Sequence, residues 1–223
     1  MVLKFPSRPE QAYASIKHRI LHGDLVPGAL LSEGTLARQL HASRTPIREA
    51  LSRLVQEGYV ERVASRGYFV APITMTLVQN LFEVRRLLEG EAAARAAERA
   101  DESALARLRE VSSLDYPGGD AASFRQAAEN NDTLHMAVAL ASQNAIFVDL
   151  VRRCLDQVTR LIALGIAHEP LAESARAEHE AIVQAIEKRH PAAARAAMER
   201  HLDHSSRAML DALVRGGVRA LTV

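Results

Sequence analysis

Residues 31–70 read LSEGTLARQLHASRTPIREALSRLVQEGYVERVASRGYFV, and this stretch decides the fold of the first third of the chain. Ser32 precedes a short segment with apolar residues on one helical face. Ser43 precedes a second segment, in which apolar residues recur at offsets of 0, 3, 4 and 7. Serine is a preferred helix N-cap, and Pro46 is tolerated in a first helical turn. The stretch therefore predicts two consecutive helices joined by a short turn.

The period of the pattern changes after Gly58. Residues 59–63 and 68–70 are rich in β-branched and aromatic side chains, and four turn-forming residues separate them. Such a pair of runs is typical of a β-hairpin. An additional helix is expected over residues 9–22, where apolar residues are spaced by four. Three helices followed by a β-hairpin form a winged helix-turn-helix.

An Ala-Pro pair at 71–72 marks the expected boundary between two domains, residues 1–72 and residues 73–223. Thr76 and Gln79 match a capping box that opens the second domain. Everything beyond has helical periodicity, and short loops break it, so we expect a mostly α protein whose second domain is an all-α six-helix antiparallel bundle. The expected helices are 76–99, 101–113, 120–141, 144–166, 171–189 and 191–214.

The near-neutral charge of the chain conceals an uneven distribution. Lys and Arg number 28 against 27 Asp and Glu, which excludes a uniformly basic nucleic-acid coat. Residues 1–74 hold 10 basic and 6 acidic residues, a net of +4, whereas residues 75–223 hold 18 and 21, a net of −3. The single Cys154 excludes an intrachain disulfide framework, and no run of about 18 apolar residues exists. We expect a cytoplasmic protein that does not enter a membrane.

The helix that begins at Ser43 carries a basic face opposite its apolar stripe. Arg44 and Arg48 are one turn apart, so both guanidinium groups project from one side near the N-terminal end. Arginine at this position can form two hydrogen bonds with guanine in the major groove. Ser43, Thr45 and the backbone N–H groups of the first turn can hold phosphates, and Arg66 at the hairpin tip can reach a neighbouring phosphate or the minor groove. A solvated basic face is the alternative, but the coincident hairpin and charge favour binding of double-stranded DNA.

The quoted stretch resembles the N-terminal domain of GntR-family transcriptional regulators, with SRTPIREAL as its most specific segment. The resemblance implies a homodimer that binds a palindromic operator. It also implies that Arg44, Thr45 and Arg48 contact bases or phosphates and that Gly67 of the wing enters the minor groove. One position departs from the family pattern, since Gly34 stands where many members carry an arginine that contacts DNA.

Two histidines of the second domain are placed symmetrically about an expected turn. His179 and His201 have residue 190 as their midpoint, and a His-Pro pair at 190–191 predicts the turn between the last two helices. With a rise of about 1.5 Å per residue, both lie roughly 15 Å from that turn along an antiparallel hairpin. They therefore lie opposite each other and can share a ligand.

A third helix supplies further candidate ligands in Asn131, Asp132 and His135. Asn131 and His135 share one face, while Asp132 is three residues before His135. Three imidazoles and one amide or carboxylate oxygen suit a divalent first-row metal, with a position left for water or an anion. The sequence predicts zinc, with nickel or manganese as alternatives, and leaves open whether Asn131 or Asp132 is the fourth ligand.

Three segments of the second domain, EVRRLLEGEAAARAA, NNDTLHMAVALASQN and EHEAIVQAIEKRHPAAARAAMERHL, resemble the FCD effector domain found in one GntR subgroup. The resemblance implies that Asn131, His135, His179 and His201 hold the metal, although many members have Asp in place of Asn131. It also implies that Arg85 faces the pocket and binds an anionic effector. An ion pair of Arg85 with a neighbouring glutamate is the competing interpretation.

These features predict a metabolite-responsive transcriptional regulator, a repressor, in which a small carboxylate binds the bundle and changes operator binding. A regulator that senses the metal directly is the alternative. A metal-dependent hydrolase is a third possibility, but it requires a general base near the metal-bound water, and Asp132 is the sole nearby candidate. A DNA-binding domain attached to an enzyme is uncommon, so we expect no enzymatic activity.

Overall fold

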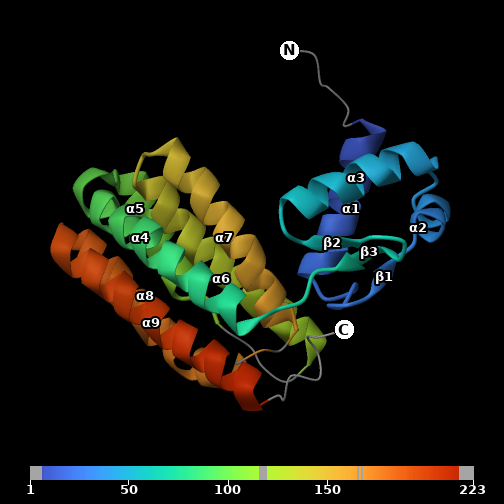
Figure 1. Ribbon diagram of the computed structural model, residues 1–223. Helices are drawn as coiled ribbons and strands as arrows, with labels where there is room; N and C mark the ends of the chain where they lie inside the picture. The colour runs from blue at the N-terminus through green and yellow to red at the C-terminus, as the bar shows by residue number, and fades with distance from the viewer. Residues whose placement is uncertain (1–6, 116–119, 165, 167, 216–223) are drawn as a thin grey trace. The chain divides into compact units, whose positions relative to one another are not determined.

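The computed structural model describes residues 7–115, 120–164, 166 and 168–215 (Figure 1). Over these ranges the chain forms nine helices and three short strands. The chain divides between Ile73 and Thr74 into two compact units, each described below by itself. Among the described residues, no helix combines the length and apolarity needed to cross a bilayer.

The N-terminal unit packs three helices against a small sheet. Ser7 and Glu10 form a capping box at the start of α1, and the Ser32 side chain accepts a hydrogen bond from the Thr35 N–H at the start of α2. The helices are buried along their apolar stripes, with Ile16 and Leu51 fully excluded from solvent. The elements are α1 (Arg8–Leu21), β1 (Leu30–Leu31), α2 (Glu33–Gln39), α3 (Arg44–Gln56), β2 (Val60–Val63) and β3 (Gly67–Val70).

The wing contains the expected hairpin and one additional strand. Strands β2 and β3 are antiparallel, with Val60 opposite Val70 and Val63 opposite Gly67. Strand β1 pairs with the other edge of β3, which gives the order β1-β3-β2. The winged helix-turn-helix is confirmed, but the sequence predicted a two-stranded hairpin. A strand of two residues is too short to show an alternating pattern, which explains why β1 was missed.

The C-terminal unit is a bundle of six helices, as expected (Figure 1). Helix α4 occupies the centre of the bundle, because it contacts α6, α7, α8 and α9. The helices are α4 (Met75–Arg99), α5 (Glu102–Ser112), α6 (Ala121–Ala141), α7 (Ala145–Ala163), α8 (His168–Glu187) and α9 (Pro191–Arg215).

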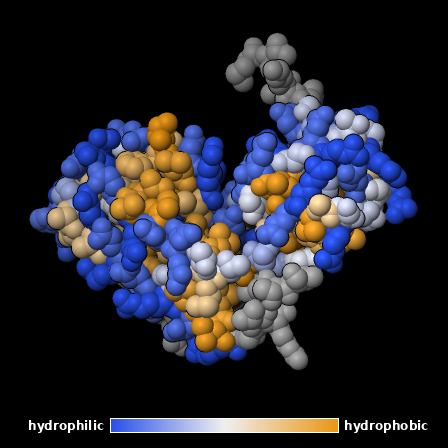
Figure 2. Space-filling view, in the orientation of Figure 1, coloured by the Kyte–Doolittle hydropathy of each residue, from blue (hydrophilic) through white to orange (hydrophobic). Residues whose placement is uncertain are grey.

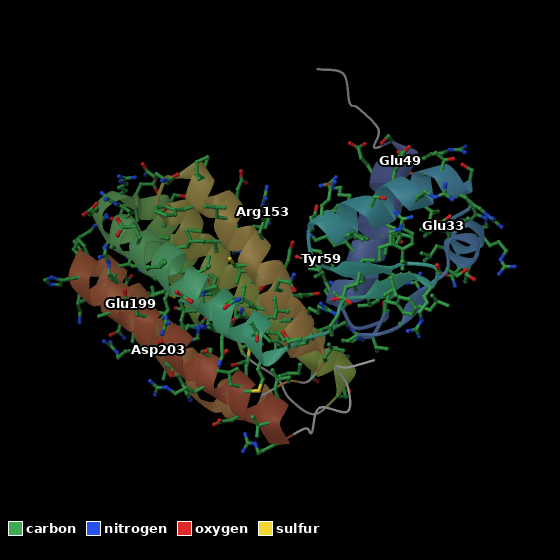
Figure 3. All side chains as sticks on the ribbon, viewed as in Figure 1. Glu33, Glu49, Tyr59, Arg153, Glu199 and Asp203 are labelled. Carbon is green, nitrogen blue, oxygen red and sulfur yellow. The ribbon has the colours of Figure 1, made fainter. Side chains whose placement is uncertain are left out.

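Small residues bring α4 and α9 close together. A side chain at Gly90 would place its Cβ 3.2 Å from Glu199 Oε1 and 3.4 Å from Arg195 Cγ, both on α9. Figure 3 labels Glu199 on this helix, and Asp203, one turn further on, accepts a hydrogen bond from Arg86 of α4. The close approach places the buried face of α4 beside the face of α9 that carries His201.

Two helix starts differ from the sequence prediction. Helix α4 begins at Met75, because the Thr74 hydroxyl accepts a hydrogen bond from the Leu77 N–H at 3.0 Å. The capping box expected from Thr76 is therefore wrong, and a hydroxyl two residues earlier caps the helix. Helix α8 begins at His168 rather than at residue 171, since proline is tolerated in the first turn of a helix.

Candidate metal centre and DNA-binding helix

Three imidazoles from three helices converge inside the bundle. His135 lies on α6, His179 on α8 and His201 on α9, and all three are buried. Each offers a ring nitrogen, and these nitrogens lie within 4.8 Å of one another. His201 Nε2 is 3.2 Å from both His179 Nε2 and His135 Nε2. The opposed placement predicted for His179 and His201 is present in the structure.

Carboxylates contact the outer nitrogens of two of these rings. Glu89 Oε2 is 2.5 Å from His135 Nδ1, and Glu178 Oε2 is 2.7 Å from His201 Nδ1. The other oxygen of Glu178 is 2.7 Å from His204 Nδ1, so His204 neighbours the cluster without joining it. A carboxylate beside Nδ1 accepts a hydrogen bond from the Nδ1–H, and this tautomer has its lone pair on Nε2. Lone pairs that face each other at 3.2 Å repel unless a cation lies between them.

This donor set fits a metal ion. Two nitrogens bound tetrahedrally to zinc at about 2.0–2.1 Å would be about 3.3 Å apart, close to the observed separations. Burial lowers the pKa of His135 to about 4 and, with the neighbouring imidazoles, lowers the pKa of His179 well below its usual value. Both rings are therefore neutral at pH 7, which is the form that binds a metal.

Glu89 is held ionised in the interior by two partners. Its Oε1 accepts a hydrogen bond of 2.6 Å from Arg85 Nε, and its Oε2 accepts from Arg85 Nη2 at 3.4 Å and contacts His135. Burial raises the pKa of Glu89, but Arg85 and His135 outweigh this effect, and the resulting pKa is about 2. The predicted effector residue Arg85 is thus also an anchor for the histidine cluster. The ion pair with a glutamate that the sequence left open is present.

The two candidates for a fourth ligand differ in their surroundings. Asn131 is buried one turn before His135 on α6. Asp132 Oδ2 accepts a hydrogen bond of 2.5 Å from Thr159 Oγ1 of α7, and burial raises the pKa of Asp132 to about 7. Among the described residues, the group whose ligand atoms converge contains the three histidines and not Asp132. Asp132 Oδ1 and Asn131 Nδ2 are both buried without a hydrogen-bond partner among the described residues, so the choice of the fourth ligand stays a prediction.

The predicted DNA-binding residues of α3 lie at the exposed end of that helix. Ser43, Arg44, Thr45 and Arg48 are all exposed, whereas Ile47 is buried. Ser43 occupies the N-cap position without a capping hydrogen bond from its side chain. Its hydroxyl and the N–H groups of the first turn are therefore able to donate to a phosphate.

A carboxylate that the sequence did not single out orients one of these arginines. Arg48 donates from Nε to Glu33 Oε1 at 3.1 Å and from Nη2 to Glu33 Oε2 at 2.8 Å. Figure 3 labels Glu33, which begins α2. On the wing, Arg66 lies in the turn between β2 and β3, and Gly67 has a φ of 106°, in the region that favours glycine.

Similarity to known sequences covers both units. The pattern of bacterial regulatory proteins of the gntR family matches residues 8–70, and the pattern of the FCD domain matches residues 80–204, more than half of the chain. The chain belongs to the GntR family and carries an FCD domain. The expected family and fold class are thereby confirmed.

Curated relatives of this GntR-family protein are transcriptional regulators. The Nta operon transcriptional regulator of Aminobacter aminovorans is 32% identical over 132 residues, which cover 59% of the chain and 62% of that protein. LutR of Bacillus subtilis is 33% identical over 64% of the chain and 70% of its own length. The repressor RspR of Escherichia coli is 33% identical over 47% of this chain and 47% of its own length. The chain thus spans about half to seven-tenths of these relatives. These three relatives are transcriptional regulators and not enzymes.

Solved structures share the fold of the GntR-family chain. A GntR transcriptional regulator from Rhodococcus sp. RHA1 superposes with a TM-score of 0.76 at 21% identity, over 92% of this chain and 99% of that one. Escherichia coli McbR/YncC gives a TM-score of 0.71 at 23% identity, over 93% and 98%.

The histidine cluster predicts the outcome of a zinc titration. Zinc at 100 times its Kd is expected to stabilise the wild-type protein by about 2.7 kcal/mol, because it binds only the folded state. His135→Ala removes one of the converging nitrogens and should abolish this stabilisation. His190→Ala, which changes an exposed histidine, should retain it. Thermal unfolding with and without EDTA measures both, and an equal zinc response of His135→Ala and wild type would contradict the assignment.

Proposed function

We propose that this GntR-family regulator holds a divalent metal ion in its FCD domain and that a small carboxylate effector binds there to change operator affinity. The convergence of three buried imidazoles carries the proposal. His135, His179 and His201 supply nitrogen ligands, and Asn131 supplies an oxygen. Zinc suits this donor set, with nickel or manganese as alternatives.

The effector would bind between the ion and Arg85. When bound, the ion supplies a Lewis-acidic position that takes a carboxylate oxygen. Among the described residues Arg85 donates to Glu89 through Nε and Nη2, and we assign its Nη1 to a second anionic group. The effector changes DNA binding only if it binds one conformation of the regulator more tightly than the other.

The DNA-binding unit would insert α3 into the major groove of a palindromic operator and place the wing in the minor groove. Arginine can read guanine through two hydrogen bonds, and hydroxyls and N–H groups position the helix on phosphates. Two recognition helices require a homodimer, and the regulator would act in the cytoplasm, as a repressor. The proposed contacts are Ser43, Arg44, Thr45, Arg48, Arg66 and Gly67.

An exposed apolar surface on α4 and α7 supports the homodimer. Leu87 of α4 is 72% exposed and Ile146 of α7 is 66% exposed, and Val84 and Leu150 lie one turn from them on the same helices. The two helices contact each other. Figure 2 shows apolar residues gathered on the helical unit. We assign this α4–α7 surface to the interface between two copies, since large exposed apolar patches mark interaction sites.

Operator binding with and without metal tests the proposed mechanism. A duplex selected by the wild-type protein from a random-sequence pool is titrated in a gel shift with a panel of small carboxylic acids. At least one acid should release the DNA from the metal-loaded protein and have no effect after EDTA treatment. A chelator that alone abolishes or induces binding would instead establish direct metal sensing. Absence of any selected duplex would contradict the regulator itself.

Recognition by α3 is tested on the same duplex. Arg44→Ala should weaken binding at least 10-fold and relax the preference at one base pair in each half-site, because a two-hydrogen-bond contact with guanine discriminates by about 1–3 kcal/mol. Arg207→Ala, which removes an exposed arginine of α9, is the matched control and should bind as wild type. An unchanged base preference for Arg44→Ala would refute its role as a base reader.

The α4–α7 surface predicts an effect on oligomeric state. Leu87→Asp combined with Ile146→Asp should convert a dimer into a monomer in analytical ultracentrifugation, because two charges would be buried without partners. Val26→Asp, at an exposed valine of the N-terminal unit, is the control. A double variant that stays dimeric at micromolar concentration would place the interface elsewhere.

A further inference from the structure

A solvent-open hollow lies on the N-terminal unit between α2 and the first turn of α3. Ser32, Gly34, Thr35, Arg38, His41 and Arg44 line most of it, with two alanines. Of these described residues none carries a carboxylate, so the lining combines two guanidinium groups, an imidazole and two hydroxyls. The hollow therefore has the chemistry of an anion site.

The two arginines at the hollow differ from their neighbour Arg48. Arg48 is paired with Glu33 through two hydrogen bonds. Arg38 and Arg44 are exposed, and neither forms an ion pair with any described residue. Arg38 donates one long hydrogen bond, of 3.5 Å, from Nη2 to the Thr35 hydroxyl oxygen. The nearby Glu33 carboxylate makes its two hydrogen bonds to Arg48 and acts on Arg44 only through its electrostatic field. Two cationic side chains that line one hollow attract an anion.

The backbone around the hollow keeps it open and keeps an imidazole beside it. Gly34 has no side chain, and the atoms nearest to its ideal Cβ position are Arg44 Nη2 at 3.7 Å and Ser32 Oγ at 4.0 Å. A Cβ at this position would make only ordinary van der Waals contacts, so Gly34 lies directly beside the Arg44 guanidinium. His41 adopts a φ of 48°, a conformation that favours glycine, and its side chain is exposed. The backbone conformation of His41 is one that non-glycine residues seldom adopt, and it places the imidazole at the rim of the hollow as a hydrogen-bond donor.

We infer that this hollow binds a backbone phosphate of the operator, with Arg38 and His41 as the donors. Helix α2 is the first helix of the helix-turn-helix, and that helix crosses the sugar–phosphate backbone while the second lies in the groove. The Thr35 hydroxyl adds a neutral donor. The contact is independent of base sequence, whereas Arg44 reads bases from the opposite rim. The inference rests on the DNA-binding function of this unit.

The salt dependence of operator binding tests the phosphate contact. Fluorescence anisotropy gives the affinity of the full-length protein for the wild-type-selected duplex across a series of salt concentrations. Arg38→Gln should reduce the slope of log K against log salt by about 2, since each phosphate contact contributes about 0.9 and a dimer makes two such contacts. The ranking of single-base variants of the duplex should stay unchanged. Gly34→Arg in the Arg38→Gln background returns a guanidinium to the hollow and should restore the slope.

A matched control and a second variant separate this contact from a general loss of charge or of fold. Arg207→Gln removes the same charge from α9 and should keep the wild-type slope. His41→Gly relieves the positive φ, so it should raise thermal stability while it weakens DNA binding. A wild-type slope for Arg38→Gln, an altered base preference, or no rescue by Gly34→Arg would overturn the phosphate site. A wild-type protein that selects no duplex would overturn DNA binding as a whole, which is a separate failure.

Discussion

The chain of hydrogen bonds from Arg85 through Glu89 to His135 is the interaction on which the C-terminal unit depends. An ionised carboxylate in a protein interior is costly unless its partners are close and well oriented, and removal of one partner leaves an uncompensated charge. Glu89 meets this requirement with an arginine one turn away on α4 and a histidine on α6. Helix α4 also packs against α7, α8 and α9, so Glu89 holds the His135 ring from the helix at the centre of the bundle.

The two units use their charged residues in opposite ways. Within the bundle, the buried charges of Arg85 and Glu89 are paired, and three imidazoles direct a ring nitrogen at one point. On the N-terminal unit, Arg38 and Arg44 are exposed and form no ion pair with a described residue, which suits a surface that meets phosphates. The division of the sequence into a part of net +4 and a part of net −3 reflects these two tasks. The net charge of the whole chain, +1, conceals this uneven distribution.

Local pattern predicted most of the fold and part of the site. Periodicity located the helices, and the symmetry of His179 and His201 about residue 190 predicted their contact because a helical hairpin has a fixed rise per residue. The sequence did not single out Glu178 and Thr159 as partners of the site, and it offered Glu89 only as one possible partner of Arg85. Their roles arise from packing between helices that are distant in the chain, which no local spacing encodes. The pairing of Arg48 with Glu33 was missed for the same reason.

The central claim is that Glu89 and Glu178 fix the Nδ1 protons of His135 and His201, so that the Nε2 lone pairs of these two rings converge with a ring nitrogen of His179 on a cation. Nitrogen-15 NMR of the histidine rings at pH 7 tests it most directly, because the chemical shifts identify the protonated nitrogen of each ring. In metal-free protein, His135 and His201 should carry their protons on Nδ1, and added zinc should shift the Nε2 resonances of His135, His179 and His201 together. Protonated Nε2 atoms, or Nε2 resonances that zinc leaves unchanged, would contradict the account.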